Sequence, residues 1–204
     1  MVKRRAFYGL VLLALVPLAI AQQSALAPRV LSFRQQAAAA SCSTLKDSYT
    51  DTTGHSDLNI ASVDGTQYRA SKFTAGSSYS VCKIEFLLMK DGSGATPTGD
   101  VKAYVWSDSS GPSTILATSD IVDASSLPAK GSSNYVAFTF ASPASLSSGT
   151  VYWVGLSKTN LQLNDWVGWF RPNPFVAGGN VLGTNGTFWV AGSSTRCNFK
   201  TYAQ

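Results

Sequence analysis

The chain has 204 residues, of which only 13% are charged, and a formal net charge of +5. This length fits a single domain that buries a sizeable core. No cluster of Lys and Arg follows the first few residues, so the sequence lacks the electrostatic footprint of a nucleic-acid-binding protein.

The N-terminus has the layout of a signal peptide. The basic start Lys3-Arg4-Arg5 precedes an almost unbroken apolar run from Phe7 to Ile20, and Ala19-Ile20-Ala21 supplies a small-x-small cleavage pattern. We expect residues 1–21 to be removed, with Ala25-Leu26-Ala27 as a second cleavage site and a retained anchor as the alternative. The run is short for a bilayer span and no second one follows, so no stable membrane span is expected after cleavage. Secretion is therefore expected.

Residues 22–40 differ in composition from the rest of the chain. They contain no acidic residue, carry Arg29 and Arg34, and end in a run of alanines. This composition indicates a linker or a frayed N-terminus. Alternatively, the strand-like stretch from Val30 to Phe33 belongs to an extended arm that completes a neighbour's sheet by β-augmentation.

Three cysteines follow, at positions 42, 82 and 197. Export implies an oxidising compartment, and an odd number allows at most one internal bridge. A bridge from Cys42 to Cys197 would close a very long loop and stabilise the fold by roughly 5 kcal/mol in the chain-entropy model. Cys82 lies in an apolar strand pattern that favours a buried thiol. We expect the pair Cys42–Cys197, although sequence alone leaves the connectivity open.

From residue 58 onward, apolar side chains recur at every second position. This period is typical of strands with one face on a core and the other toward solvent. The expected core faces hold Cys82, Ile84, Phe86 and Leu88; Val101, Ala103 and Val105; Val136, Phe138 and Phe140; and Tyr152, Val154 and Leu156. Turns at 90–100, 107–113 and 173–180 separate the strands, and 142–150 is expected to be a further connection. The pattern predicts an all-β fold, one antiparallel β-sandwich over residues 41–204.

Groups that could catalyse a reaction are sparse. His55 is the only histidine and has Asp51 and Asp57 nearby, but no nucleophile-elbow motif is present, and we expect an exposed loop residue. Glu85, the only glutamate, alternates with a core face and is expected to face solvent, which disfavours a glycosidase pair. We therefore expect a protein that is not an enzyme.

Metal-ligand patterns are equally weak, and no cofactor is expected. One histidine and three widely spaced cysteines exclude the usual zinc arrangement. Aspartates in or near turns are expected to shape those turns, with a structural calcium as the alternative. These residues are Asp91, Asp100, Asp108, Asp120 and Asp123.

Aromatic side chains carry the strongest functional signal. In the stretch NDWVGWFRPNPF, at 164–175, the period of two places Trp166 with Phe170 and Trp169 with Arg171. We expect the first pair inside and the second outside. The outward set forms a ligand surface, because exposed aromatic rings stack on sugars; the alternative is that the rings fill the sandwich. The set is Tyr104, Trp106, Trp153, Trp169 and Arg171.

Between Tyr68 and Tyr202 the chain resembles a known family. The pieces PTGDV, DSSGP, DASSL and SSGTVYW, in this order, are similar to the choice-of-anchor modules, R type, of secreted and surface-anchored bacterial proteins. The resemblance implies an exported jelly-roll β-sandwich without a catalytic set. The chain ends in FKTYAQ with no apolar sorting tail, so simple secretion or assembly is expected rather than anchoring.

Two functions follow from these observations. The first is a secreted non-catalytic module that binds carbohydrate or another cell-surface polymer. The second is a structural subunit of an extracellular filament, sheath or matrix, in which copies of the protein join through the arm at 22–40. Asn185-Gly186-Thr187 is also a glycosylation sequon, relevant in hosts that modify such sites.

Overall fold

The computed structural model describes residues 41–52, 56–60, 68–91, 97–159, 166–172, 181–184, 189–191 and 196–204. The expected leader at 1–21, the arm at 22–40, His55 and the sequon at 185–187 lie outside these residues.

The described part of the domain consists of two antiparallel sheets and one short 3₁₀ turn, η1 (Ala124–Ser126). Sheet A contains β1 (Thr44–Tyr49), β2 (Ser56–Ile60), β4 (Tyr79–Lys90), β8 (Asn134–Leu146), β10 (Val167–Arg171) and β13 (Phe199–Ala203). Sheet B contains β3 (Tyr68–Thr74), β5 (Asp100–Asp108), β6 (Pro112–Thr118), β7 (Val122–Asp123), β9 (Val151–Lys158), β11 (Val181–Thr184) and β12 (Trp189–Ala191). The predicted antiparallel β-sandwich is confirmed.

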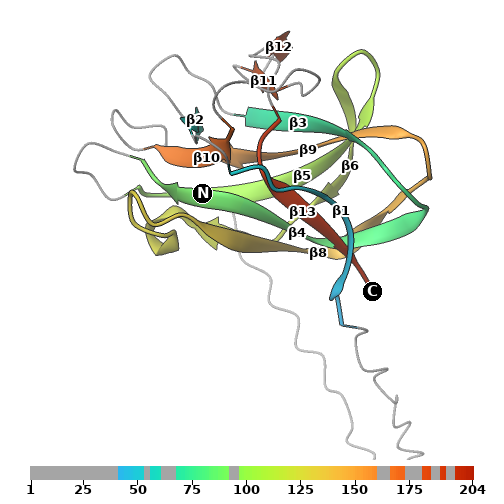
Figure 1. Cartoon of the computed structure of the whole chain (residues 1–204), viewed down its shortest axis with the longest axis horizontal. Coiled ribbons are helices and arrows are strands. Elements are labelled where there is room, and N and C mark those ends of the chain that lie inside the picture. The colour runs from blue at the N-terminus through green and yellow to red at the C-terminus, as the bar shows by residue number, and fades with distance from the viewer. Residues whose placement is uncertain are drawn as a thin grey trace, which may run out of the picture. The chain divides into compact units, whose positions relative to one another are not determined.

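The strand order is that of a jelly roll. Sheet A runs β1-β13-β4-β8, and sheet B contains the run β3-β9-β5-β6. The chain changes sheet at each step from β3 to β4 to β5 and again from β8 to β9 to β10, which interleaves the two layers (Figure 1). Closing the sheets on each other in this way is one solution to the problem of exposed strand edges. β13 and β10 pair with successive parts of the same edge of β4: β13 with residues 81–86 and β10 with residues 88–90.

The core lies between the sheets, and period-two alternation explains which residues fill it. Every second side chain points inward from each strand. The residues of β5, β8 and β9 that the pattern assigned to the core lie there, and so do Ile84, Phe86 and Leu88 of β4. Phe86 is the centre of an aromatic group, with its ring edge-on to Phe138 at 5.6 Å and to Trp169 at 5.0 Å.

One expected connection is instead a strand. β8 continues through residues 142–146, because Ala144 and Leu146 bury their side chains in the core while Ser145 pairs with Ser80 of β4. The turn follows at Ser147–Thr150, where the Thr150 amide donates to the Ser147 carbonyl and Gly149 takes a positive φ of 73°. This part of β8 is rich in Ser and Ala and lacks β-branched residues, so its sequence does not predict a strand.

The expected Cys42–Cys197 bridge is wrong: Cys42 is bonded to Cys82, with 5.9 Å between the Cα atoms. Cys197 is a buried free thiol. The reason is an irregularity in β4, whose pairings with both neighbours jump between Val81 and Lys83. This bulge places Val81 in the core cluster and takes Cys82 out of the row of Ile84. Cys82 therefore reaches the segment that precedes β1.

The bridge bears on the environment of the protein. A disulfide persists in oxidising compartments and is rare in reducing ones. Among the residues that the structure describes, no helix has the length and apolar character needed to cross a bilayer.

We expect the double variant Cys42→Ala/Cys82→Ala to lose about 4 kcal/mol of unfolding free energy, because the bridge closes a loop of 40 residues. Urea unfolding measures the loss. Cys197→Ala keeps the bridge, so a reductant should destabilise this variant and leave the double variant unchanged. If the unfolding free energy of Cys197→Ala were the same with and without reductant, the Cys42–Cys82 pairing would be contradicted.

Candidate binding site

The expected aromatic surface is divided between two places in the fold. Tyr104, Trp106 and Trp153 share the outer face of sheet B, as the alternation of β5 and β9 predicts. Trp169 lies instead in the central core. The set therefore does not form one continuous platform.

The outer face of sheet B is also closed rather than open. Trp106 and Trp153 are only 3% and 2% exposed. Trp189 of β12 lies edge-on to Trp106 at 5.5 Å, and Tyr104 stacks on Trp106 at 5.1 Å. Such edge-on and stacked pairs are the favoured geometries of aromatic rings. The expectation that Trp106 and Trp153 are exposed to a ligand is wrong: Tyr104 and Trp189 cover Trp106, and Lys72 Nζ lies over the Trp153 ring, 5.6 Å from its centroid.

Polar groups at the margin of this cluster are satisfied within the protein. The Trp153 Nε1–H donates to Asp108 Oδ1 at 2.6 Å, and Lys72 Nζ lies 3.8 Å from the same oxygen. The Ser157 hydroxyl donates to Tyr104 Oη at 3.1 Å. Burial, with Tyr104 nearby, raises the pKa of Tyr68. The aromatic residues on the outer face of sheet B therefore form a small second hydrophobic core.

The expected orientation of β10 is reversed. Trp169 is fully buried between the sheets and donates its Nε1–H to the Asn198 carbonyl at 2.8 Å, and Arg171 follows it on the same face of the strand. Phe170 points to the opposite side, onto the outer face of sheet A, where it packs with Leu87 and Met89. Trp166 is half-buried. The period of two separates Trp169 from Phe170 correctly, but the sides expected for these two residues are exchanged.

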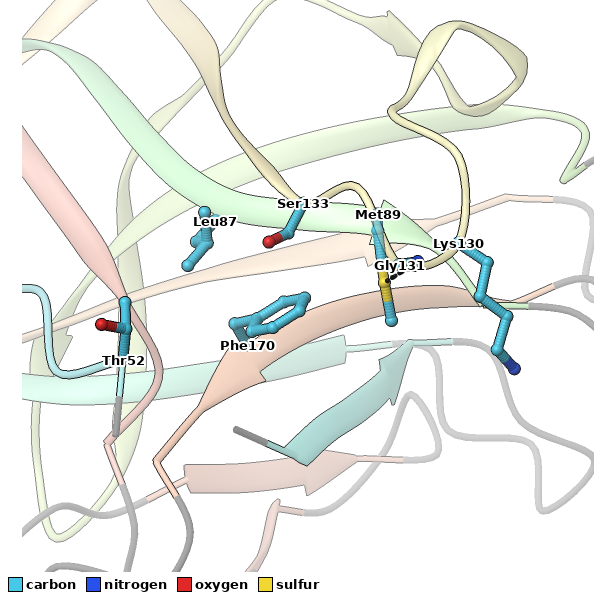
Figure 2. Close-up of a pocket in the computed structure, with 7 residues that line it drawn as sticks. All are labelled: Thr52, Leu87, Met89, Lys130, Gly131, Ser133 and Phe170. Atoms are coloured by element: carbon cyan, nitrogen blue, oxygen red, sulfur yellow. Dashed lines mark hydrogen bonds between the residues drawn. The ribbon is translucent and has the colours of Figure 1, made fainter. Parts of the chain in front are cut away.

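A pocket of about 360 Å³ opens on the outer face of sheet A, and we call it the sheet A pocket. Its apolar floor consists of Leu87 and Met89 from β4 and Phe170 from β10, which all alternate with core residues and so face away from the core. In Figure 2 the Phe170 ring lies between Thr52 and Met89, and the Lys130 side chain extends away from it. Ligand sites in proteins typically measure about 300–1,000 Å³, so the volume suits one ring-sized group.

The rim of the pocket comes from the loop between η1 and β8. Lys130, Gly131 and Ser133 line it (Figure 2). The Ser132 amide donates to the Ala129 carbonyl, and Gly131 between them has a φ of +81°, which glycine adopts without strain. The Gly131 amide donates to Met89 Sδ at 3.3 Å, which fixes this loop against the floor.

Charge at the pocket mouth is largely balanced. Lys130 Nζ lies 2.8 Å from Asp91 Oδ1, and the Asp91 side chain is 11% exposed whereas that of Lys130 is 62% exposed. The rim also includes Ser133 and Thr52, each of which carries a hydroxyl group. The pocket thus combines an apolar floor, neutral hydroxyls and a paired cation, which is the general composition of a small-ligand site.

A hydrogen-bonded network borders the pocket along β4. Glu85, half-buried on the outer face as expected, accepts from Lys83 Nζ at 2.9 Å and from the Tyr202 hydroxyl at 2.7 Å. Lys200 Nζ lies 3.7 Å above the ring of Tyr135, and that ring packs against the pocket floor. On the outer face of sheet A, β4 is therefore polar at Lys83 and Glu85 and apolar at Leu87 and Met89.

Two pKa shifts in this network are physically linked. Burial alone would raise the pKa of Glu85, but the hydrogen bonds from Lys83 and Tyr202 outweigh it, so this pKa lies below its usual value. Burial and the hydrogen bond to Glu85 raise the pKa of Tyr202 to about 12. The carboxylate is thus held in its charged form.

The turn aspartates hold donors from the protein itself. Asp91 pairs with Lys130, Asp108 accepts from Trp153, Asp120 accepts from the Thr139 hydroxyl, and Asp123 caps η1 through the Ser125 amide. Within the described ranges, no group of three His, Cys, Asp or Glu side chains could hold a metal ion.

The floor of the pocket was not predicted from the sequence, although the sequence contains a signal for it. Phe86-Leu87-Leu88-Met89 is a continuous apolar run, whereas a strand with one face in water alternates. Such a run predicts that both faces of β4 are buried here. Phe170 carries no comparable signal, because its side depends on how β10 pairs with β4.

A scan against protein-family models and a search of curated proteins find no match to this chain. The resemblance to choice-of-anchor modules stays a prediction.

We expect Glu85→Gln to destabilise the protein at neutral pH. Because the pKa of Glu85 is lowered on folding, its contribution is complete above the unfolded value, about 4.3, and is lost as the pH falls through the folded value. The difference in unfolding free energy between wild type and variant, measured by urea titration across this range, should therefore shrink on acidification. For Tyr202→Phe, the difference in unfolding free energy from wild type should also shrink on acidification, but by less. A difference that grows toward low pH would contradict the assignment.

Proposed function

We propose that the protein is a secreted, non-catalytic β-sandwich module that binds carbohydrate or another extracellular surface polymer, and that the sheet A pocket is its contact site. The N-terminal leader pattern and the Cys42–Cys82 disulfide support an extracytoplasmic location. The observation that carries the proposal is the apolar pocket on an outer sheet face, bordered by hydroxyl groups.

The chemistry of the pocket suits a sugar ring. One face of a sugar presents C–H groups, and Phe170, Leu87 and Met89 offer a matching apolar surface. Hydroxyl groups at the ring edge require donors and acceptors, which Ser133 supplies at the rim. Thr52 also lines the pocket, although its hydroxyl points away from Phe170 in Figure 2. The ion pair between Lys130 and Asp91 cancels most of the charge at the mouth, which favours a neutral ligand over a strongly anionic one.

A substitution that fills the pocket from its rim tests this proposal. Ser133→Phe should weaken binding about tenfold or more, because the new ring occupies the space above the floor. Affinity is measured against an array of defined oligosaccharides and by pull-down with cellulose, chitin and peptidoglycan. Thermal unfolding checks that each variant folds.

Two matched variants serve as controls. Ser132→Phe places the same ring on the same loop, one residue outside the pocket lining, and should leave affinity unchanged. Tyr104→Ala alters the outer face of sheet B and should also have no effect. The proposal fails if the folded wild-type protein binds none of these polymers, or if Tyr104→Ala abolishes binding while Ser133→Phe does not.

A second candidate function is a structural subunit of an extracellular filament, sheath or matrix. One observation favours it: of the four large apolar residues exposed in the described part of the chain, three lie on β6 or just after it. Exposed apolar groups that gather at a strand edge are typical of interaction sites.

A further inference from the structure

β6 forms an open edge of sheet B. Among the described strands it pairs only with β5. Its sequence, Pro112–Thr118, contains no charged residue, and Ile115 and Leu116 are 53% and 38% exposed. Ile121, shortly after the strand, is 54% exposed. An uncharged edge with large apolar side chains is a ready template for another strand.

The other described edges with known side chains are protected. β1 also exposes an apolar residue, Leu45 at 51%, but Lys46 and Asp47 follow it, and charges on an edge oppose strand addition. β8 exposes small or polar groups such as Ala137 and Thr139, and its Thr139 carbonyl accepts from the Asp120 amide. β6 begins with Pro112 and pairs irregularly with β5, but it carries no charged residue along its length and is the least protected of the three edges.

Acidic residues stand at both ends of the β6 edge. Asp108, on the neighbouring strand β5, pairs across from Pro112 where β6 begins, and its carboxylate also accepts from Trp153. Asp120 lies exposed two residues after β6 ends and accepts from the Thr139 hydroxyl. From the first to the last Cα, the seven residues of β6 make six steps of about 3.3 Å and so span about 20 Å. The edge thus presents an uncharged apolar centre between two carboxylates.

The sequence holds one segment with the complementary pattern. Residues 29–34 read Arg-Val-Leu-Ser-Phe-Arg, an uncharged, largely apolar centre between two cations. Fully extended, they span about 17 Å, close to the length of the β6 edge. Because both ends of the segment carry the same charge, the match holds in either strand direction.

We propose that residues 29–34 of one copy add to the β6 edge of a second copy as a further strand of sheet B. β1, the first described strand, lies at one edge of the sandwich, whereas β6 contacts β8 at the opposite edge. Each copy has one donor segment and one acceptor edge. Such a head-to-tail contact builds open chains or rings rather than closed dimers. This inference rests on the second candidate function and is independent of the sheet A pocket.

Sedimentation velocity of the processed full chain at rising concentration, with negative-stain electron microscopy, tests the proposal. The wild type should assemble. Ile115→Lys places a cation on the acceptor edge, and Arg29→Asp/Arg34→Asp reverses the charge of the donor. Each variant should raise the concentration needed for assembly about tenfold or more, because like charges are brought together. Leu45→Lys, with nearly equal exposure on the opposite edge, should assemble like the wild type.

The possible outcomes distinguish failure of the proposed β6 contact from failure of the structural-subunit function on which it rests. A wild-type chain that stays monomeric at high concentration overturns both. Assembly that persists unchanged in Ile115→Lys, or in the donor variant, retains the structural function but overturns this edge and this segment as its basis. Equal loss in Leu45→Lys and Ile115→Lys also overturns the assignment to β6.

Discussion

The double-sided burial of β4 is the constraint on which the rest of this structure depends. β4 pairs with β8 on one side and with β13 and β10 on the other. Its inner face carries Ile84, Phe86 and Leu88 into the core, and its outer face carries Leu87 and Met89 into the pocket floor. The disulfide and the Glu85 network start from the same strand. Displacing β4 would therefore alter core, bridge and pocket together.

The two outer faces of the sandwich show why an outward side chain need not be exposed. On sheet B, Trp106 points away from the core, yet Tyr104 and Trp189 cover it. On sheet A, Phe170 and Met89 also point outward and are only 6% and 4% exposed, but a pocket remains above them beside the loop from η1 to β8. Burial on an outer face is decided by the segments that fold over it. An apolar pocket with a polar rim is the form expected of a ligand site.

The alternation of apolar and polar residues within each strand predicted much of the fold. The features that it did not predict depend on pairing between strands far apart in the sequence. The core faces of β5, β8 and β9 follow directly from their sequences. For β10, alternation separates Trp169 from Phe170 but cannot choose which faces the core. That choice comes from register, since Trp169 pairs with Leu88, a residue far away in the chain. The Cys42–Cys82 bridge was missed for a related reason: a bulge shifts Cys82 relative to Ile84, and no local pattern marks it.

The pocket could have been anticipated only in part, from the apolar run Phe86-Leu87-Leu88-Met89. The central functional claim is that ligands contact the outer face of sheet A there. Backbone amide chemical shifts, followed by NMR during titration with an oligosaccharide that the protein binds, test this claim most directly. The account predicts that the largest shifts occur at Leu87, Met89, Gly131, Ser133 and Phe170. Shifts concentrated instead at Tyr104, Trp106 and Trp153, with the sheet A pocket unchanged, would contradict it.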